Sequence, residues 1–284
     1  MSEYLHVEKP FLDQLAALGW MIVDQGCGMI PSDPAASLRD NFREWLLPQV
    51  FRDAVRAINP WLTDRQLEDL RSQILRQPNR TLLESNETIQ KLFFKAQVDV
   101  NEVTGESDPV VKLIDFEHPE KNIFHAINQF RIDTPGCVKN FIIPDIVLFV
   151  NGIPLVVVEA KIGDANTANP MHAAFEQLLR YRNGRDETKV AGLREGEPRL
   201  FHTNLLMITT CGEKAAYGSI TSGYEHFYPW KDIWPEKFAT YAPPLGAERE
   251  QERLIQGMLP RETLLDILRS CSVFMDTDSG KRVK

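Results

Sequence analysis

Two acids and a lysine frame a long apolar stretch in the middle of the chain, within the segment PDIVLFVNGIPLVVVEAK. Asp145 lies near its start, and Glu159 and Lys161 lie at its end. Two carboxylates held close together in a half-buried strand repel each other unless a cation lies between them, and oxygen ligands suit Mg²⁺. Such an ion can polarise a phosphodiester and activate water, with the backbone carbonyl of Ala160 as a further ligand and Mn²⁺ as a substitute ion. A lysine beside it would stabilise the charge that develops on phosphorus.

These groups share a site only if the surrounding strands bring them together. The Asn151-Gly152 dipeptide divides the apolar stretch and is the strongest short-range signal for a β-hairpin. Because side chains alternate along a strand, Glu159 and Lys161 lie on the same face. The register of the hairpin then decides on which face Asp145 lies.

The length of the hairpin turn sets this register. A two-residue turn pairs Val150 with Ile153 and places Asp145 on the opposite face from the other two polar groups. A three-residue turn with Gly152 as a bulge pairs Phe149 with Ile153 and brings Asp145 to the shared face. We therefore expect the three-residue, bulged turn.

A helix after the hairpin adds two polar residues. It is expected to begin at Asn169-Pro170 and to end at Asn183-Gly184, because proline is favoured at the first helical position and glycine just past the end. Gln177 and Tyr181 are four residues apart and lie on one face of this helix, which would border the metal site. An apolar strand over residues 205–210 follows, and the order of strand, crossover helix and strand predicts a parallel pair.

The first 92 residues are predicted to form a mainly helical layer that packs on the core. An apolar stripe predicts a first helix that stops near Gly19, and it consists of Phe11, Leu12, Leu15 and Leu18. Further helical stretches cover residues 38–58 and 63–75, the second with a capping box of Thr63 and Gln66. β-like runs follow at residues 94–100, 110–116, 124–132 and 141–161. We expect the β-rich core over residues 93–240 and a helical connector over residues 241–284.

The overall composition is that of an ordinary globular protein. The chain has 284 residues, 43% of them hydrophobic, and a formal net charge of -8 at pH 7. No run of about 18 apolar residues could span a membrane, and the N-terminus lacks the pattern of a signal peptide. The four cysteines form no CxxC pair, so a reducing cytoplasm fits best. The acidic balance argues against a protein that coats nucleic acid.

The combination of motifs resembles the PD-(D/E)XK nuclease superfamily, and more closely the N-terminal nuclease domain of the restriction (R) subunit of type I restriction–modification enzymes. The similarity extends over most of the chain and includes FLDQLAALGW, LIDFEHPEKNIFHAINQF, the hairpin segment and GSITSGYEHFYPWK. It implies an α/β, restriction-endonuclease-like fold, in which a mixed β-sheet is flanked by helices. It also implies roles for six residues: metal binding by Asp145 and Glu159, catalysis by Lys161, support of DNA contact and cleavage by Gln177 and Tyr181, and a place near the metal for Glu8.

The activity implied by this resemblance is Mg²⁺-dependent cleavage of double-stranded DNA without sequence specificity, within a type I restriction complex. Separate methylation and specificity subunits would recognise the target. R subunits of this family continue into an ATP-driven motor domain, but no GxxxxGK[ST] loop occurs in this chain. ATP binding and DNA translocation are therefore not assigned to it, and residues 241–284 are expected to lead toward that motor.

Two other functions fit the same residues. One is a stand-alone PD-(D/E)XK nuclease, for example in DNA repair. The other is a non-catalytic docking module of a DNA-processing complex, in which the acids only shape an interface. A D…ExK spacing by itself is a weak pattern, since an ordinary hairpin with exposed charges also produces it.

Other residue groups carry weaker signals. The six histidines form no HxxxH pattern and are expected to be scattered surface or core residues. An aromatic group is expected mainly to pack against the sheet or to dock on a neighbouring domain, although it could stack bases. It consists of Tyr224, Phe227, Tyr228, Trp230 and Trp234. A basic patch at the end of the crossover helix suits either DNA-backbone contact or a solvated helix end, and it consists of Arg180, Arg182, Arg185 and Lys189.

Overall fold

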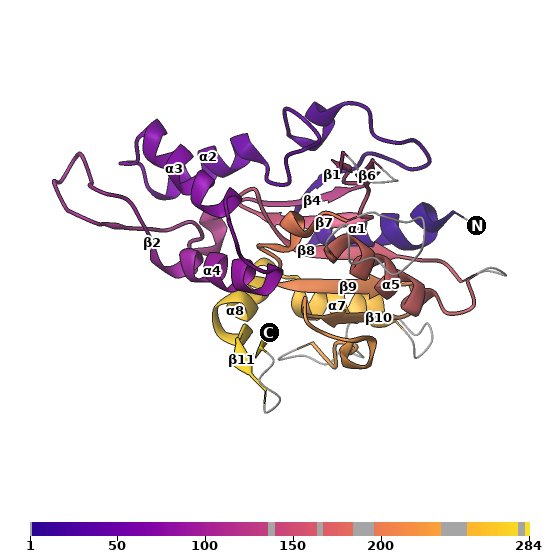
Figure 1. Ribbon diagram of the computed structural model, residues 1–284. Helices are drawn as coiled ribbons and strands as arrows, with labels where there is room; N and C mark the ends of the chain where they lie inside the picture. Colours follow the sequence, from indigo (N-terminus) through magenta and orange to yellow (C-terminus); the bar gives the residue numbers. More distant parts are fainter. Residues whose placement is uncertain (1, 136–139, 164–166, 184–195, 234–248, 278–281) are drawn as a thin grey trace.

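The computed structural model describes residues 2–135, 140–163, 167–183, 196–233, 249–277 and 282–284. Its centre is a six-stranded mixed sheet in the order β1-β4-β7-β8-β9-β10, and Figure 1 shows these strands one below another across the middle of the molecule. β1 is parallel to β4 and β8 is parallel to β9, whereas the remaining neighbours are antiparallel. The expected α/β, restriction-endonuclease-like mixed sheet is confirmed, and so is the parallel pair. The strands are Met21–Val23 (β1), Phe124–Asn128 (β4), Ile146–Val150 (β7), Ile153–Ala160 (β8), Leu206–Thr210 (β9) and Ala215–Gly218 (β10).

Short two-stranded ribbons lie outside this sheet. They pair β2 (Ala96–Gln97) with β3 (Val110–Val111), β5 (Ile132–Asp133) with β6 (Phe141–Ile142), and β11 (Met275–Asp276) with β12 (Arg282–Val283). The β-like runs expected from the sequence are therefore longer than the strands that form. The run at 94–100 was wrong at its start, because residues 94 and 95 complete a capped helix instead.

Helices surround the sheet. The α-helices are Lys9–Ala17 (α1), Pro48–Ile58 (α2), Asp64–Leu75 (α3), Leu82–Lys95 (α4), Pro170–Arg182 (α5), Glu250–Met258 (α7) and Arg261–Asp266 (α8). Single turns of π-helix are Tyr4–Glu8 (η1) and Ile267–Cys271 (η6), and 3₁₀ turns are Pro34–Ser37 (η2), Pro119–Lys121 (η3), Pro198–Phe201 (η4) and Tyr224–His226 (η5). In the part of the chain that the structure describes, no helix has both the length and the apolar character needed to cross a bilayer.

Several local signals in the sequence set these helices. The Thr63–Gln66 capping box forms at the start of α3, and Gly19 has the positive φ of 84° that ends the first helix. The helix expected over residues 38–58 is wrong in its first half, since α2 begins only at Pro48. Leu38 adopts a left-handed φ of 60°, and the side chain of Asn41 accepts a hydrogen bond from Arg43 N–H at 2.9 Å, so this stretch forms turns.

The central hairpin is buried on both sides. Every residue of β7 and β8 is buried, which fits a continuous apolar run better than an alternating one. α5 packs against β8 and β9, while α7 packs against β10 and α1. The N-terminal region is thus not only a helical layer, because it also supplies the edge strand β1.

The hairpin register differs from the expected one. The turn has two residues, since Val150 pairs with Ile153, and the positive φ angles of Asn151 (51°) and Gly152 (75°) suit it. The predicted three-residue turn is therefore wrong. A bulge lies further along instead, where the pairing shifts between Leu148 and Phe149 and leaves Leu155 as the extra residue on β8.

This bulge, and not the turn, places Asp145 on the same face of the sheet as Glu159. Beyond it Ile146 pairs with Val158, so the next position along places Asp145 opposite Glu159. Residues directly opposite each other on neighbouring strands share a face. Asp145 and Glu159 therefore meet across the open end of the hairpin.

Candidate metal centre

The open end of the β7–β8 hairpin brings together the three charged residues that frame it. The backbone N–H of Ala160 donates to Asp145 Oδ2 at 2.8 Å. Lys161 Nζ lies 2.8 Å from Glu159 Oε1 and 3.5 Å from Asp145 Oδ2. The side chains are largely enclosed, because Asp145 is 9% exposed and Glu159 is fully buried. The sequence-predicted trio thus forms one compact charged cluster.

One carboxylate oxygen of Glu159 has no hydrogen-bond partner in the described part of this cluster. This oxygen, Oε2, is also buried. Burial raises the pKa of Glu159 well above its usual value and the nearby Asp145 raises it further, whereas Lys161 lowers it. A buried carboxylate oxygen without a partner is costly, and a cation or a proton would relieve that cost.

Lys161 is the cationic group in contact with these acids. Its Nζ also donates to the carbonyl of Ala160 at 2.7 Å. Burial lowers the pKa of Lys161, but Glu159, Asp145 and Glu3 raise it more, so that the net pKa lies above its ordinary value. The ammonium therefore keeps its proton at neutral pH. It touches every oxygen group that the sequence proposed for a metal.

A second set of acids comes from the N-terminal helix. One oxygen each of Glu3, Glu8 and Asp145 lies within 4.8 Å of the others, a spacing that one metal ion could bridge. Burial, and then Asp145, raises the pKa of Glu8 to about 7. Glu8 therefore lies near the proposed metal ligands, as the resemblance implied, and Glu3 joins it.

Glu3 could not be predicted from an α-helical spacing. Residues five apart lie on different sides of an α-helix, which has 3.6 residues per turn. Here η1 forms the i→i+5 hydrogen bond from Lys9 N–H to Tyr4 O, so the π-turn places Glu3 and Glu8 on the same side. π-turns of this kind occur often at functional sites.

Gln129 is a second residue that the sequence did not indicate. Its backbone N–H donates to Asp145 O at 2.8 Å, and its side-chain amide donates to Glu8 Oε2 at 3.1 Å. It adopts a left-handed φ of 48° just after β4, a strained conformation for a residue other than glycine. Gln129 thus connects the N-terminal acids to the hairpin. Only contacts between distant segments reveal it.

The Gln177–Tyr181 pair lies behind the segment that leads to Asp145. Gln177 Nε2 donates to Tyr181 Oη at 2.7 Å, and that hydroxyl donates to Ile143 O at 3.2 Å. Tyr181 is 1% exposed. Tyr181 therefore contacts the chain two residues before Asp145 from within the core, where it can position that segment, and Gln177 holds its hydroxyl.

The aromatic group packs within the fold where the structure describes it. Tyr224 and Phe227 both lie against Phe175 of α5, at ring-centroid distances of 5.4 and 5.1 Å. Trp230 lies 5.7 Å from Tyr217. This supports the packing interpretation of the aromatic group. Trp234, Arg185 and Lys189 lie outside the described residues, as does the expected boundary at residue 240.

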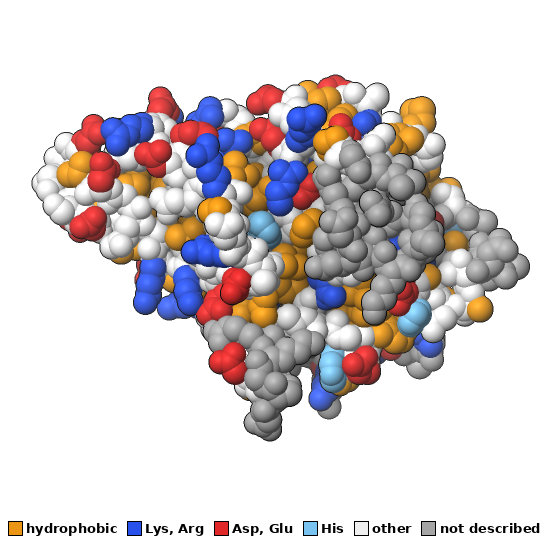
Figure 2. Space-filling view, viewed as in Figure 1, with side chains coloured by type: hydrophobic (Ala, Val, Ile, Leu, Met, Phe, Trp, Pro, Cys, Tyr) orange, Lys and Arg blue, Asp and Glu red, His pale blue; other side chains and the backbone are white. Residues whose placement is uncertain are grey.

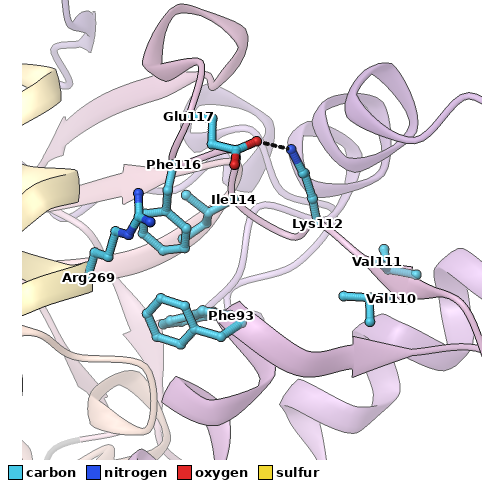
Figure 3. Close-up of a pocket in the computed structure, with 9 residues that line it drawn as sticks. Phe93, Val110, Val111, Lys112, Ile114, Phe116, Glu117 and Arg269 are labelled. Carbon is cyan, nitrogen blue, oxygen red and sulfur yellow. Dashed lines mark hydrogen bonds and ion pairs between the residues drawn. The ribbon is translucent and has the colours of Figure 1, made fainter.

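A separate apolar pocket of about 200 Å³ lies between α4, β3 and η6 (Figure 3). The rings of Phe94 and Phe116 stack at 5.0 Å, and Lys112 Nζ forms an ion pair with Glu117 at 2.9 Å. None of the residues that line it belongs to the charged cluster. Its walls offer no set of converging carboxylates, so it is a poor candidate for metal-dependent chemistry.

The donors at the hairpin end fit a hard divalent cation. They are carboxylate and carbonyl oxygens, which Mg²⁺ prefers, and a buried oxygen of Glu159 lacks a partner among the described residues. Asp145, Glu159 and the Ala160 carbonyl would hold such an ion. The neighbouring Glu8 and Glu3 make the site strongly acidic, which would increase its attraction for a cation.

Comparison with known proteins gives consistent matches. Residues 1–226 match the family model described as "Type I restriction enzyme R protein N terminus". The chain is 29% identical over 280 residues to the type I restriction enzyme HindI endonuclease subunit of Haemophilus influenzae. This alignment covers 98% of this chain and 24% of that protein. The chain is 26% identical over 234 residues to the putative type I restriction enzyme MjaIXP endonuclease subunit of Methanocaldococcus jannaschii, covering 82% of this chain and 21% of that protein. The chain thus spans about a quarter of the length of these relatives.

Proposed function

The chain belongs to the family of type I restriction enzyme R protein N termini, and on that premise we propose that its charged hairpin end is the nuclease site of such an endonuclease subunit. The reaction is Mg²⁺-dependent hydrolysis of phosphodiester bonds in double-stranded DNA, without sequence specificity. Mn²⁺ would substitute for Mg²⁺. The observation that carries the proposal is the unpartnered, buried Oε2 of Glu159 beside Asp145 and a protonated lysine.

Each residue of the site would have a distinct task. Asp145 and Glu159, with the Ala160 carbonyl, would hold the ion. Its chemistry there would be to polarise the phosphodiester and to lower the pKa of a water molecule. Lys161 supplies a fixed positive charge beside the phosphorus, where negative charge develops during attack.

Residues outside the ligand set would position it. Tyr181 donates a hydrogen bond to the Ile143 carbonyl, and the backbone N–H of Gln129 donates to the Asp145 carbonyl. The Asp145 side chain accepts the Ala160 N–H, so both strands of the hairpin are tied at their open ends. Such contacts limit the movement of ligand groups, on which ion affinity and reaction rate both depend.

The electrostatics favour delivery of DNA by partners. Figure 2 shows basic and acidic side chains of the described residues interspersed over the visible face, with no continuous basic band there. Together with a net charge of -8, this predicts weak intrinsic affinity for DNA. Methylation and specificity subunits, and an ATP-dependent motor region of the same subunit, would bring DNA to the site in the cytoplasm.

Calorimetric titration with Mn²⁺ tests the metal site directly. The wild-type chain should bind Mn²⁺, and Asp145→Asn should weaken binding by more than about tenfold because it removes a charged ligand. Asn keeps an oxygen that can accept the Ala160 N–H, so folding should be intact. The matched control is Asp40→Asn, which changes an exposed acid and should leave affinity unchanged.

Cleavage by the assembled enzyme separates a nuclease from a docking module. Lys161→Ala in the complete R subunit, combined with its partners, should abolish DNA cleavage while the subunit still folds and assembles. Retained cleavage would show that the cluster only shapes an interface. Cleavage by the chain with neither partners nor motor region would instead favour a stand-alone nuclease.

A further inference from the structure

Glu3 occupies an unusual place in the charged cluster. Its Oε2 accepts the backbone N–H of Ile162 at 3.1 Å, and its Oε1 lies 3.7 Å from Lys161 Nζ. These two donors belong to the residues that directly follow β8. The Glu3 carboxylate therefore lies where the chain leaves the proposed metal ligands.

The two groups that contact Glu3, an ammonium in an ion pair and a backbone N–H that donates a hydrogen bond, also bind phosphate oxygens in other proteins. An ammonium and a backbone N–H form charge-assisted hydrogen bonds to an anionic oxygen, and DNA phosphates are bound by the same two groups. A carboxylate oxygen and a non-bridging phosphate oxygen are alike in charge and in accepting capacity. Glu3 thus presents to Lys161 and Ile162 what a DNA phosphate would present.

The cluster also holds more carboxylates than a working site needs. Glu3, Glu8, Asp145 and Glu159 all lie close to Lys161 or to one another. Mg²⁺ usually takes one or two carboxylates and completes its shell with water and substrate phosphate. An incoming phosphate adds further negative charge, so one carboxylate has to give way.

Glu3 is the acid best placed to leave. Its side chain is 29% exposed, against 9% for Asp145 and none for Glu159. Glu8 is 2% exposed and is also held by Gln129. Glu3 lies just before the π-turn η1, whereas Asp145 and Glu159 belong to the ends of the central hairpin.

We propose that Glu3 is an internal competitor for DNA phosphate: its carboxylate occupies the phosphate-oxygen position beside Lys161 Nζ and Ile162 N–H until a DNA phosphate displaces it. The inference rests on the nuclease function proposed above. Glu3 then lowers the affinity of the free site for DNA and keeps Lys161 held when no DNA is present. It is a regulatory contact and not a ligand that the loaded site requires.

The test measures binding of a short fluorescent DNA duplex by anisotropy, at fixed low salt and without divalent cations. Glu3→Ala should tighten binding about three- to tenfold, the range expected when a competing ion pair with a partly buried lysine is removed. Glu102→Ala removes the same charge from an exposed position and should change affinity by less than about twofold.

A second pair of variants tests whether the gain in DNA affinity from Glu3→Ala depends on Lys161. In a Lys161→Met background, Glu3→Ala should give no larger gain than Glu102→Ala, because the position for the phosphate oxygen has lost its cation. Equal gains from Glu3→Ala with and without Lys161 would overturn the proposal. So would the absence of any gain in the chain that retains Lys161.

Calorimetry with Mn²⁺ distinguishes this proposal from the nuclease assignment. If Glu3 is a competitor, Glu3→Ala leaves Mn²⁺ affinity within about threefold of the wild type, because Asp145 and Glu159 remain. A loss of about tenfold or more would make Glu3 a required ligand and would contradict the proposal. If Asp145→Asn leaves Mn²⁺ binding intact, the nuclease site itself fails, whatever Glu3 does.

Discussion

The two ends of the β7–β8 hairpin differ in how completely their buried polar side chains are hydrogen-bonded. At the turn, Asn151 is fully buried, and its side-chain amide donates to Leu113 O at 2.9 Å and to Asn122 Oδ1 at 2.8 Å. Its Oδ1 accepts Ile123 N–H at 2.8 Å. At the open end Glu159 is just as buried, yet its Oε2 has no partner among the described residues.

The backbone is hydrogen-bonded at both ends of the hairpin. The turn is closed against α2, because Leu47 N–H donates to Gly152 O at 2.9 Å and a Cβ at Gly152 would lie 2.6 Å from Leu47 O. At the open end the backbone is tied as well, because Lys161 N–H donates to Thr210 O at 2.9 Å and Gln129 N–H donates to Asp145 O at 2.8 Å. The difference between the two ends therefore lies in the charged side chains. The full hydrogen bonding of Asn151 indicates a structural role for this residue, whereas the unpartnered carboxylate oxygen of Glu159 indicates a missing ligand at the open end. Substitutions at the two ends should therefore affect different properties.

The largest expected effect is on cleavage, from a change at the open end. Glu159→Gln in the complete subunit should lower DNA cleavage by the assembled enzyme more than about 100-fold, because it removes a charged ion ligand. In the ion-free chain the same change should leave the melting temperature unchanged or raise it, since glutamine is neutral like the protonated acid that burial favours. A clear loss of stability would mean that Glu159 is architectural.

A change at the turn should give the converse result. Asn151→Ala leaves the Leu113 carbonyl and the Ile123 N–H without their buried partner, which should cost about 2–5 kcal/mol in the free energy of unfolding. Chemical denaturation measures that loss. Mn²⁺ affinity of the folded variant should stay within about twofold of the wild type, because the sites are independent. A loss of affinity beyond that would show that the two ends are coupled.

The pH dependence of stability should reveal the buried acid Glu8 near the open end. The folded pKa of Glu8 is raised to about 7, from 4.5, by burial and by Asp145. The folded state therefore binds more protons than the unfolded state between these values, and the stability from this group is present below pH 4.5 and is lost as pH rises toward 7. Without divalent ions, Glu8→Gln should be about 3 kcal/mol more stable relative to wild type at pH 8 than at pH 4. Parallel stability profiles for the two proteins would contradict this.

A histidine near the turn should make a smaller contribution to the pH dependence of stability, with stability lost as pH falls. His202 neighbours Thr203, whose hydroxyl donates to Pro154 O, and burial lowers the pKa of His202 from 6.5 to about 4. The unfolded state binds more protons in that interval, so stability present above pH 6.5 is lost as pH falls toward 4. His202→Gln should reduce this acid sensitivity by about 1–2 kcal/mol, since the side chain is partly solvated. Denaturant midpoints at pH 4.5 and 7.5 measure it.

Much of the fold was predictable because the signals are local. Asn151-Gly152 specified a hairpin, Asn169-Pro170 specified the start of α5, and Thr63 with Gln66 specified the start of α3. The three charged groups at the hairpin end were also correctly brought together, although for the wrong reason. The bulge at Leu155 lies within a uniform run of apolar residues, and no glycine or turn residue marks it.

The missed parts depend on contacts between distant segments. Glu3 joins the cluster only because the helix locally widens into a π-turn, and Gln129 joins it through a left-handed backbone that no local residue demands. β1 is three residues long and takes its place by pairing with β4, a hundred residues later. Short segments of this kind are fixed by tertiary structure and not by their own propensity.

The central claim is that Asp145 and Glu159 share one divalent cation at the open end of the hairpin. The most direct measurement is a crystal structure of the chain soaked in Mn²⁺, with the ion located by its anomalous scattering. The account predicts one peak about 2.1 Å from an oxygen of each carboxylate, with Glu159 Oε2 now bound and Lys161 Nζ moved away from Glu159. Clear density for both side chains with no ion between them, at a Mn²⁺ concentration that saturates the calorimetric titration, would contradict it.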